Sequence, residues 1–290
     1  MKQILITGAG SYIGTQVRDY LARFPGQYAV SELNMHGDGW RQADFHGVDA
    51  ILHTAGIVHR EETKHDPAFR ELYETVNRDL PAAVAEKAKR EGVRQFLFLS
   101  TQSVYGLSAP LGKPVVITKD TPLAPVDLYG SSKAEAEAKL LPMSDDAFRV
   151  AILRPPIVYG KGCKGNYLAL EKFAGKLPVF PKVENGRSMI YIENLCELIR
   201  QLLADEAAGI FCPQNDEYTN TSQMVAAIAR EKGRHICLVP GFTWALKLLG
   251  NFVPAVSKAF GSLQYDRELS AYGKGYCVKN LAQSIAETER

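Results

Sequence analysis

The order of apolar and polar positions predicts alternating strands and helices along the first 212 residues. Short apolar runs predict buried strands at residues 3–7, 28–34, 48–53, 95–100, 149–153 and 210–212. Apolar spacing near 3.6 predicts helices at residues 15–24, 66–90, 128–140 and 193–204. Strands that alternate with helices in this way predict an α/β fold with a doubly wound parallel sheet.

The pattern becomes less regular after residue 160. It predicts a short strand at 189–192 and helices at 166–176 and 222–232. Residues 242–256 form an apolar segment that Lys247, Asn251 and Pro254 interrupt, so it is too short to span a membrane. We expect a helix that covers the core or a substrate pocket, with a peripheral membrane contact as the alternative.

Composition excludes several classes of protein. The chain has 290 residues, 46% of them hydrophobic and 23% charged, as is ordinary for a water-soluble globular protein. A net charge of +2 gives no electrostatic case for binding nucleic acid. The five cysteines have no zinc spacing, so we expect no metal site and reduced thiols. Because residues 4–6 lead into a glycine turn and not into a cleavage site, we expect a cytoplasmic protein with no integral membrane segment.

A glycine-rich turn joins the first strand to the first helix. In such a turn Gly8 allows the tight bend, and Gly14 lets the helix pack close to the strand. The free N–H groups at the helix start would then face a pyrophosphate. We expect a dinucleotide to contact Gly8, Gly10, Ser11, Tyr12, Ile13 and Gly14, and the alternative is a plain tight turn.

The next two strand ends carry the other candidate cofactor contacts. A carboxylate at the end of the second strand usually binds the adenosine ribose, but Asn34 stands there. Asn34 can bond a hydroxyl without repelling a 2′-phosphate, so the choice between NAD and NADP stays open. Asp38 can approach the adenine, and the small residues Thr54, Ala55 and Gly56 allow close backbone approach. Asn77, in the following helix, can brace a neighbouring strand.

Tyr129 and Lys133 lie four residues apart on the helix predicted at 128–140. That spacing places them on one face, one turn from each other. A lysine charge beside a tyrosine favours the phenolate, which turns a group of ordinary pKa near ~10 into a usable base. The alternative is an exposed helix face without chemistry.

Several motifs occur together in a familiar order. They are the glycine turn, the stretch from Ser100 to Gly106, Tyr129-x-x-x-Lys133, Leu153-Arg154-Pro155 with Val158-Tyr159-Gly160, and the stretch from Arg187 to Leu195. In these motifs the chain resembles the extended short-chain dehydrogenase/reductase superfamily. Within it, residues 1 to about 235 resemble the NAD-dependent nucleotide-sugar epimerase/dehydratase family, including UDP-glucose 4-epimerases.

The resemblance implies a Rossmann-type domain at 1–160, to which 185–235 returns, and a smaller C-terminal substrate-binding subdomain at 161–184 and 236–290. It implies that Thr101 bonds the reacting sugar hydroxyl, Tyr129 is the base and Lys133 holds the nicotinamide ribose. It adds Ser100, Asn77, Pro156, Tyr129 and Lys133 to the cofactor site. Its substrate site contains Gln102, Ser103, Asn166, Tyr167 and Arg187, with the arginine on the nucleotide diphosphate. A homodimer is expected by the same analogy.

Three departures from the family pattern bear on the reaction. Ser11 replaces the central glycine of the turn. Gln102 and Ser103 replace the acidic pair of the dehydratases, so we expect no removal of water. Ile157 replaces an asparagine usual in galactose epimerases and is closer to the reductases. The leading expectation is NAD-dependent epimerisation of a nucleotide sugar, a UDP-hexose, at C4. The alternatives are an NAD(P)H-dependent 4-keto-sugar reductase and a non-catalytic dinucleotide sensor.

Overall fold

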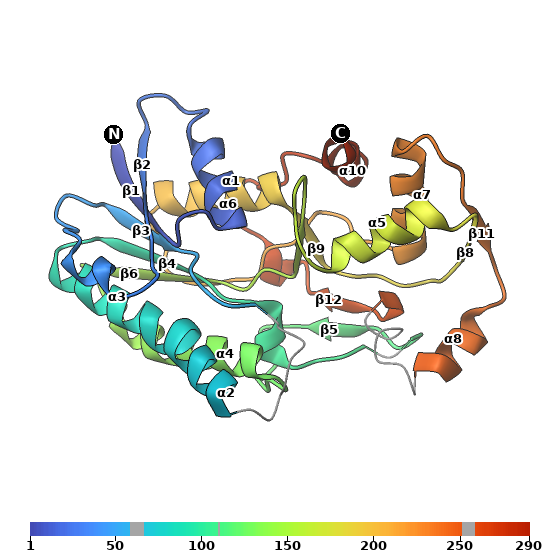
Figure 1. Cartoon of the computed structure of the whole chain (residues 1–290), viewed down its shortest axis with the longest axis horizontal. Coiled ribbons are helices and arrows are strands. Elements are labelled where there is room, and N and C mark those ends of the chain that lie inside the picture. Colours follow the sequence, from blue (N-terminus) through green and yellow to red (C-terminus); the bar gives the residue numbers. More distant parts are fainter. Residues whose placement is uncertain (59–66, 110, 251–258) are drawn as a thin grey trace. The chain divides into compact units, whose positions relative to one another are not determined.

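The computed structural model describes residues 1–58, 67–109, 111–250 and 259–290, and the chain forms two compact units (Figure 1). The first unit contains residues 1–106, 122–155 and 196–212. The second contains residues 107–121, 156–195 and 213–290. Of the stretch 185–235, which the sequence assigned to the dinucleotide-binding domain, the first unit therefore contains residues 196–212.

The first unit is built on one six-stranded sheet with the order β10-β6-β4-β3-β1-β2. Every neighbouring pair is parallel, which confirms the predicted doubly wound α/β fold. The strands are β1 (Lys2–Thr7), β2 (Tyr28–Leu33), β3 (Ala50–His53), β4 (Gln95–Leu99), β6 (Arg149–Leu153) and β10 (Gly209–Phe211). All four residues of β3 and all five of β4 are buried, as expected for strands that are covered on both faces.

Helices cover both faces of this sheet. Residues of α3 and α4 pack with Phe96, Phe98 and Ile152 in one buried apolar cluster on one face. Figure 1 shows α1 and α6 on the opposite face. The helices and helical turns of this unit are α1 (Tyr12–Leu21), η1 (Gly39–Gln42), α2 (Pro67–Tyr73), η2 (Glu74–Asp79), α3 (Leu80–Arg90), η3 (Gln102–Tyr105), α4 (Leu128–Leu140), η4 (Leu141–Met143) and most of α6 (Ile192–Ala204).

Two helices differ from the sequence prediction for local reasons. Helix α1 begins at Tyr12, three residues earlier than expected, because the Ser11 side chain accepts a hydrogen bond from the Gly14 N–H and caps the helix. The helix expected at 66–90 is divided into α2 and α3 by the π-helical turn η2, and Asp66 lies outside the described residues. Asn77 lies in this turn and is completely buried.

The second unit has three two-stranded parallel sheets, β7–β9, β8–β11 and β5–β12. Its elements are β5 (Val115–Ile117), β7 (Ile157–Tyr159), α5 (Asn166–Lys176), β8 (Val179–Pro181), β9 (Met189–Tyr191), α7 (Thr221–Glu231), β11 (Cys237–Val239), α8 (Thr243–Gly250), β12 (Leu263–Tyr265), η5 (Glu268–Ser270) and α10 (Leu281–Glu289). Helix α7 packs against α5 and α10. The apolar segment expected at 242–256 is helical at α8, and residues 251–256 lie outside the described residues. No helix among the described residues has the length and apolar character needed to cross a membrane.

The order of strands locates the site within the first unit. Strand β1 pairs with β2 on one side and with β3 on the other, so the chain reverses its direction of winding between β1 and β3. In open α/β sheets, ligands bind outside the carboxyl ends of the strands at such a point. The glycine turn follows β1 there, and Thr54 to Gly56 follow β3.

Candidate active site

The glycine turn and the segment after β3 touch each other. A Cβ atom on Gly8, whose φ is +122°, would lie 2.6 Å from the Ala55 nitrogen, so only glycine fits. Ser11 has a φ of −66°, which any residue adopts, and its hydroxyl lies 2.7 Å from that of Thr54. Ser11 therefore fits at the position of the usual central glycine. The N–H groups of the first turn of α1, which contains Tyr12 and Ile13, remain at the place where a pyrophosphate would be bound.

The two residues that the sequence predicts near the adenosine, Asn34 and Asp38, lie at the surface. Asn34 is exposed just beyond β2, and its side-chain oxygen accepts a hydrogen bond from the His36 N–H at 2.9 Å. Asp38 is exposed as well and pairs with Arg41 at 3.1 Å. The backbone N–H groups of Gly8 and Ala9 both bond to Leu33 O, so the end of β2 lies beside the glycine turn. No carboxylate of β2 occupies the position that would reject a 2′-phosphate.

The Asn77 side chain makes three hydrogen bonds within the protein. Its oxygen accepts a hydrogen bond from the Ile57 N–H at 2.9 Å, and its nitrogen donates to Ile57 O and to the Ser132 hydroxyl. Because these bonds use its side chain within the protein core, Asn77 fixes the segment after β3 against α4. This role fits the expected brace.

The three candidate catalytic residues come together at the carboxyl end of β4. Thr101 follows β4 and caps η3 by accepting a hydrogen bond from the Ser103 N–H at 3.1 Å. Tyr129, in the first turn of α4, is hydrogen-bonded to Thr101. Helix α4 is held at this point because the Asp127 side chain accepts a hydrogen bond from the Gly130 N–H. Lys133 follows one turn later on the same helix.

Burial sets the charge of this pair. It raises the pKa of Tyr129 to about 12, an effect that the hydrogen bond to Thr101 opposes. It lowers the pKa of Lys133 to about 7, against the attraction of Glu137. The Lys133 Nζ donates to Leu99 O at 2.8 Å and lies 4.4 Å from the centre of the Phe98 ring. In the ligand-free protein near pH 8, Tyr129 is therefore a proton donor, and it must lose its proton before it can act as a base.

Two further residues of the site, Glu137 and Arg154, were not predicted as site residues from the sequence. Glu137 lies one turn beyond Lys133, and Arg154 follows β6. Their side chains are buried and joined by three hydrogen bonds of 2.5 to 3.1 Å. Arg154 also donates to the Tyr105 hydroxyl at 2.8 Å. This network ties α4 to the ends of two strands, and losing one partner of such a buried pair typically costs about 3–5 kcal/mol. The sequence contained a signal for Glu137, because this residue continues the four-residue spacing of Tyr129 and Lys133 on the same helix.

Ser100 belongs to the same network. Its hydroxyl is buried and donates to Glu137, so this residue, expected to contact the cofactor, positions α4. Its neighbours have other partners. The Gln102 N–H donates to Pro155 O at 2.9 Å, and the Thr101 hydroxyl lies within hydrogen-bond distance of the Ser103 hydroxyl. The Gln102 side-chain nitrogen is buried and has no hydrogen-bond partner in the described part of the chain, so it remains a free donor.

His53 is at the end of β3, and the structure supports a role in the core. It is completely buried, its Nδ1 lies 2.8 Å from the Thr7 hydroxyl, and its ring stacks on Phe96. Burial and then the nearby Lys133 lower its pKa to about 3, so the ring stays neutral.

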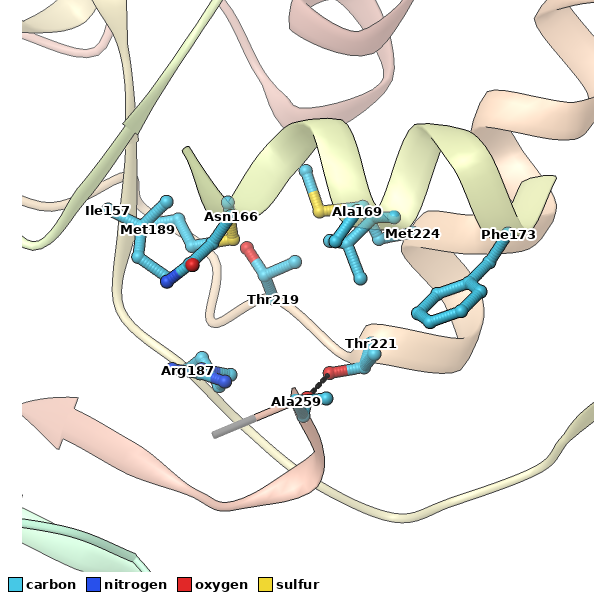
Figure 2. A pocket seen from close by; sticks show the side chains of 11 residues that line it. Ile157, Asn166, Ala169, Phe173, Arg187, Met189, Thr219, Thr221, Met224 and Ala259 are labelled. Carbon is cyan, nitrogen blue, oxygen red and sulfur yellow. Dashed lines mark hydrogen bonds between the residues drawn. The ribbon is translucent and has the colours of Figure 1, made fainter. Parts of the chain in front are cut away.

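The second unit contains a separate pocket of about 230 Å³ (Figure 2). Its size is below the ~300–1,000 Å³ typical for a whole small ligand, so it accommodates part of one. Asn166 and Arg187, two of the expected substrate contacts, both line it, as does Ile157. The pocket is otherwise mostly apolar and is lined by Ala169, Leu170, Phe173, Met189, Thr219, Thr221, Met224 and Ala259.

Arg187 and Thr219 supply polar atoms that are free to bind a ligand. Their backbones form an antiparallel bridge with two hydrogen bonds of 2.8 and 3.0 Å. The Arg187 Nε and the Thr219 hydroxyl are buried, and neither has a hydrogen-bond partner among the described residues. Burial lowers the pKa of Arg187. No carboxylate in the described part of the chain pairs with the guanidinium to oppose this effect. An unpaired guanidinium beside a free hydroxyl is suited to bind an anion.

Tyr167 and Pro156, two more expected site residues, do not line this pocket. Tyr167 is 1% exposed, its ring stacks on Tyr159 and its hydroxyl donates to Glu289 of α10 at 2.6 Å. Tyr167 thus holds α10, whereas Asn166, on another side of the same helix, faces the pocket. Pro156 is buried and belongs to the second unit.

We expect Gly14→Val to abolish dinucleotide binding, because the glycine turn has no room for a side chain at that position. A Cβ on Gly14 would lie 2.5 Å from the Ser11 oxygen and 2.9 Å from an Ile6 methyl carbon, so the turn and helix must separate. Titration calorimetry with NAD and NADP measures the loss. Gly175→Val, at a helical glycine of α5 with open space around it, is the matched control. Unchanged affinity in Gly14→Val would contradict the assignment.

Comparison with known proteins places these features in context. The model of the NAD dependent epimerase/dehydratase family matches residues 4–211. The chain is 30% identical to a UDP-glucose 4-epimerase of Vibrio cholerae, over 91% of this chain and 87% of that protein.

Solved structures of this fold include enzymes of more than one reaction. A UDP-glucuronic acid 4-epimerase of Bacillus cereus in complex with NAD has a TM-score of 0.74 at 15% identity, covering 99% of this chain and 97% of that one. A dTDP-4-dehydrorhamnose reductase of Clostridium acetobutylicum has a TM-score of 0.72 at 15% identity, covering 99% and 98%. At these identities the likeness concerns the fold.

Proposed function

Because the chain belongs to the NAD dependent epimerase/dehydratase family, as its motifs predicted, we propose that this enzyme epimerises a nucleotide sugar, a UDP-hexose, at C4 through a 4-keto intermediate. The observation that carries the proposal is the hydrogen bond between Tyr129 and Thr101, with Lys133 one turn away. This arrangement suits proton transfer at a single sugar oxygen. The unpaired Arg187 in the second unit supports a substrate with a diphosphate.

The residues of the first unit also fit a dinucleotide cofactor. The glycine turn leaves no room for side chains where the pyrophosphate would approach, and α1 directs its N–H groups to the same place. We propose NAD as the cofactor, with NADP as the alternative because Asn34 presents no carboxylate. When bound, the nicotinamide supplies the site that accepts and returns a hydride.

Each candidate catalytic residue has a defined task in this mechanism. Thr101 orients the reacting hydroxyl, and Tyr129 takes its proton as the carbonyl forms. Lys133, which is fixed by its hydrogen bond to Leu99 O, stabilises the Tyr129 phenolate when the lysine is protonated. In the second half of the reaction Tyr129 returns the proton to the oxygen of the inverted carbon. Gln102 and Ser103 carry no acidic group, so this turn does not supply the acid that removal of water requires.

A one-way reductase of a 4-keto nucleotide sugar is the second candidate. Two observations favour it: Ile157 lines the pocket of the second unit, and burial keeps Tyr129 protonated, ready to donate to a keto oxygen. An epimerase must retain its reduced cofactor between half-reactions, whereas a reductase must release the oxidised cofactor in every cycle.

Proton NMR of the sugar distinguishes the two reactions. The enzyme is incubated with UDP-glucose or UDP-N-acetylglucosamine without added cofactor, and the C4 configuration is followed. We expect interconversion of the C4 epimers and no 4-keto-6-deoxy product. Failure to interconvert, together with stoichiometric oxidation of NAD(P)H on a 4-keto sugar, would establish the reductase instead.

A further inference from the structure

Large apolar side chains are exposed on helix α8 of the second unit. The exposed fractions are 51% for Phe242, 72% for Trp244 and 57% for Leu248. Trp244 and Leu248 are four residues apart, so they lie on one face of the helix. Apolar residues that gather on an exposed face mark an interaction surface more often than isolated ones do. Neither the candidate catalytic residues nor the pocket of this unit uses these side chains.

A second exposed apolar group contains Phe173 of α5, which also lines the pocket, and two residues that follow this helix. Phe173, Leu177 and Val179 are 39%, 36% and 53% exposed. Val179 begins β8, which pairs with β11, and the Lys182 N–H donates to Val239 O at 2.9 Å. Helix α8 begins four residues after Val239, so the chain leads directly from this sheet into α8. Figure 1 shows α8, β8 and β11 at the same end of the second unit.

Cations are exposed on the elements that precede α8 in the second unit. Five exposed lysines and arginines on or beside α5, β8, α7 and β11 have no carboxylate partner among the described residues: Lys172, Lys176, Lys182, Arg230 and Arg234. In the same elements Lys232 pairs with Glu171 and Glu289. Glu184 and Glu231 are the exposed acidic residues nearby in sequence, so positive charge predominates. Unpaired cations beside exposed tryptophan and leucine are typical of helices that lie in a membrane interface.

We propose that this end of the second unit docks on a membrane surface that contains anionic lipids. Phe242, Trp244 and Leu248 enter the boundary between head groups and acyl chains, and the exposed lysines and arginines of the neighbouring elements contact the phosphates. A second copy of the same face fits less well, because it would oppose like charges, and lysine is depleted in the cores of protein interfaces. The inference does not depend on the reaction proposed above.

Vesicle binding tests the inference, and the chain contains its own fluorescent reporter. Of its two tryptophans, Trp40 is 3% exposed and buried in the first unit, whereas Trp244 is 72% exposed. We expect the intact protein to sediment with phosphatidylcholine vesicles that contain phosphatidylglycerol, and not with phosphatidylcholine alone. Trp244 emission will shift to shorter wavelength, brominated acyl chains will quench it, and added salt will reverse binding.

Two variants and a control separate the apolar from the ionic contribution. Trp244→Ser combined with Leu248→Ser will lower the partition coefficient at least ~tenfold, since each loses the gain from apolar burial. Lys182→Gln will lower it about fivefold, the effect of one cation near an anionic surface. Val126→Ser, at a 77% exposed valine of the first unit, will leave it unchanged.

Three results would overturn the inference. The first is the absence of sedimentation with anionic vesicles at low salt. The second is binding that the Trp244→Ser and Leu248→Ser pair does not weaken. The third is a dimer in light scattering that the same pair converts to a monomer while vesicles leave Trp244 emission unchanged, because the face would then pair with a second copy of the chain.

Discussion

Tyr129→Phe should reduce turnover at least ~10²-fold while cofactor affinity stays nearly unchanged. The substitution removes the hydroxyl that is bonded to Thr101 and changes the side-chain volume very little. Phenylalanine has no ionisable group, so the side chain at this position can no longer transfer the proton. Steady-state kinetics on the sugar identified by NMR, with titration calorimetry for the cofactor, measure both effects.

The pH profile gives the same prediction a second readout. Sugar oxidation requires Tyr129 to lose a proton, so the wild-type rate of this half-reaction should rise with pH. The Tyr129→Phe rate should lose this dependence, because phenylalanine has no proton to lose. Tyr167→Phe is the matched control, since it removes a buried tyrosine hydroxyl that bonds Glu289 in the second unit. A Tyr129→Phe enzyme that turns over at the wild-type rate would refute the assigned role.

The fold was predictable because its signals are local in the sequence. Apolar runs located the strands of the parallel sheet, and the glycine turn occurs where the chain passes from β1 to α1. The interruption at η2 was not predictable, since the apolar spacing at 66–90 continues through it. What accompanies the interruption is a set of bonds from Asn77 to Ile57 and Ser132, which only the tertiary structure brings together.

The candidate site was predictable in its motifs and less so in the partners of each residue. Tyr129 and Lys133 lie on one helix, so their spacing alone places them together. The position of Ser100 in its motif suggested a cofactor contact, whereas its hydroxyl bonds Glu137, which is 37 residues away. Asn166 and Tyr167 are adjacent in sequence, yet one faces the pocket and the other α10. Sequence order cannot show which of two neighbours turns inward.

The isolation of Arg187 is also invisible in the sequence, and it leads to a prediction with two opposite effects. A half-buried guanidinium with a buried Nε and no carboxylate partner among the described residues destabilises the ligand-free protein, and its lowered pKa reflects that cost. Arg187→Met fills similar space without the charge. We therefore expect the variant to unfold at a higher temperature than the wild type when no ligand is present, by an amount corresponding to at least ~1 kcal/mol.

The same substitution should weaken UDP binding at least ~10²-fold, since hydrogen bonds from a charged donor contribute ~1.5–3 kcal/mol each and a guanidinium can make two to a phosphate. Uridine, which lacks the diphosphate, should bind wild type and Arg187→Met alike. Arg187→Lys should lie between them, because an ammonium keeps the charge and loses the planar fork. Calorimetry measures the affinities for UDP and for uridine, and thermal unfolding of the ligand-free proteins measures their stability. Equal loss of affinity for UDP and uridine would mean that Arg187 shapes the pocket of the second unit, and unchanged affinity for UDP would remove it from the substrate site. A gain in stability that accompanies a selective loss of UDP is expected only if the protein keeps this cation unpaired for an anionic ligand.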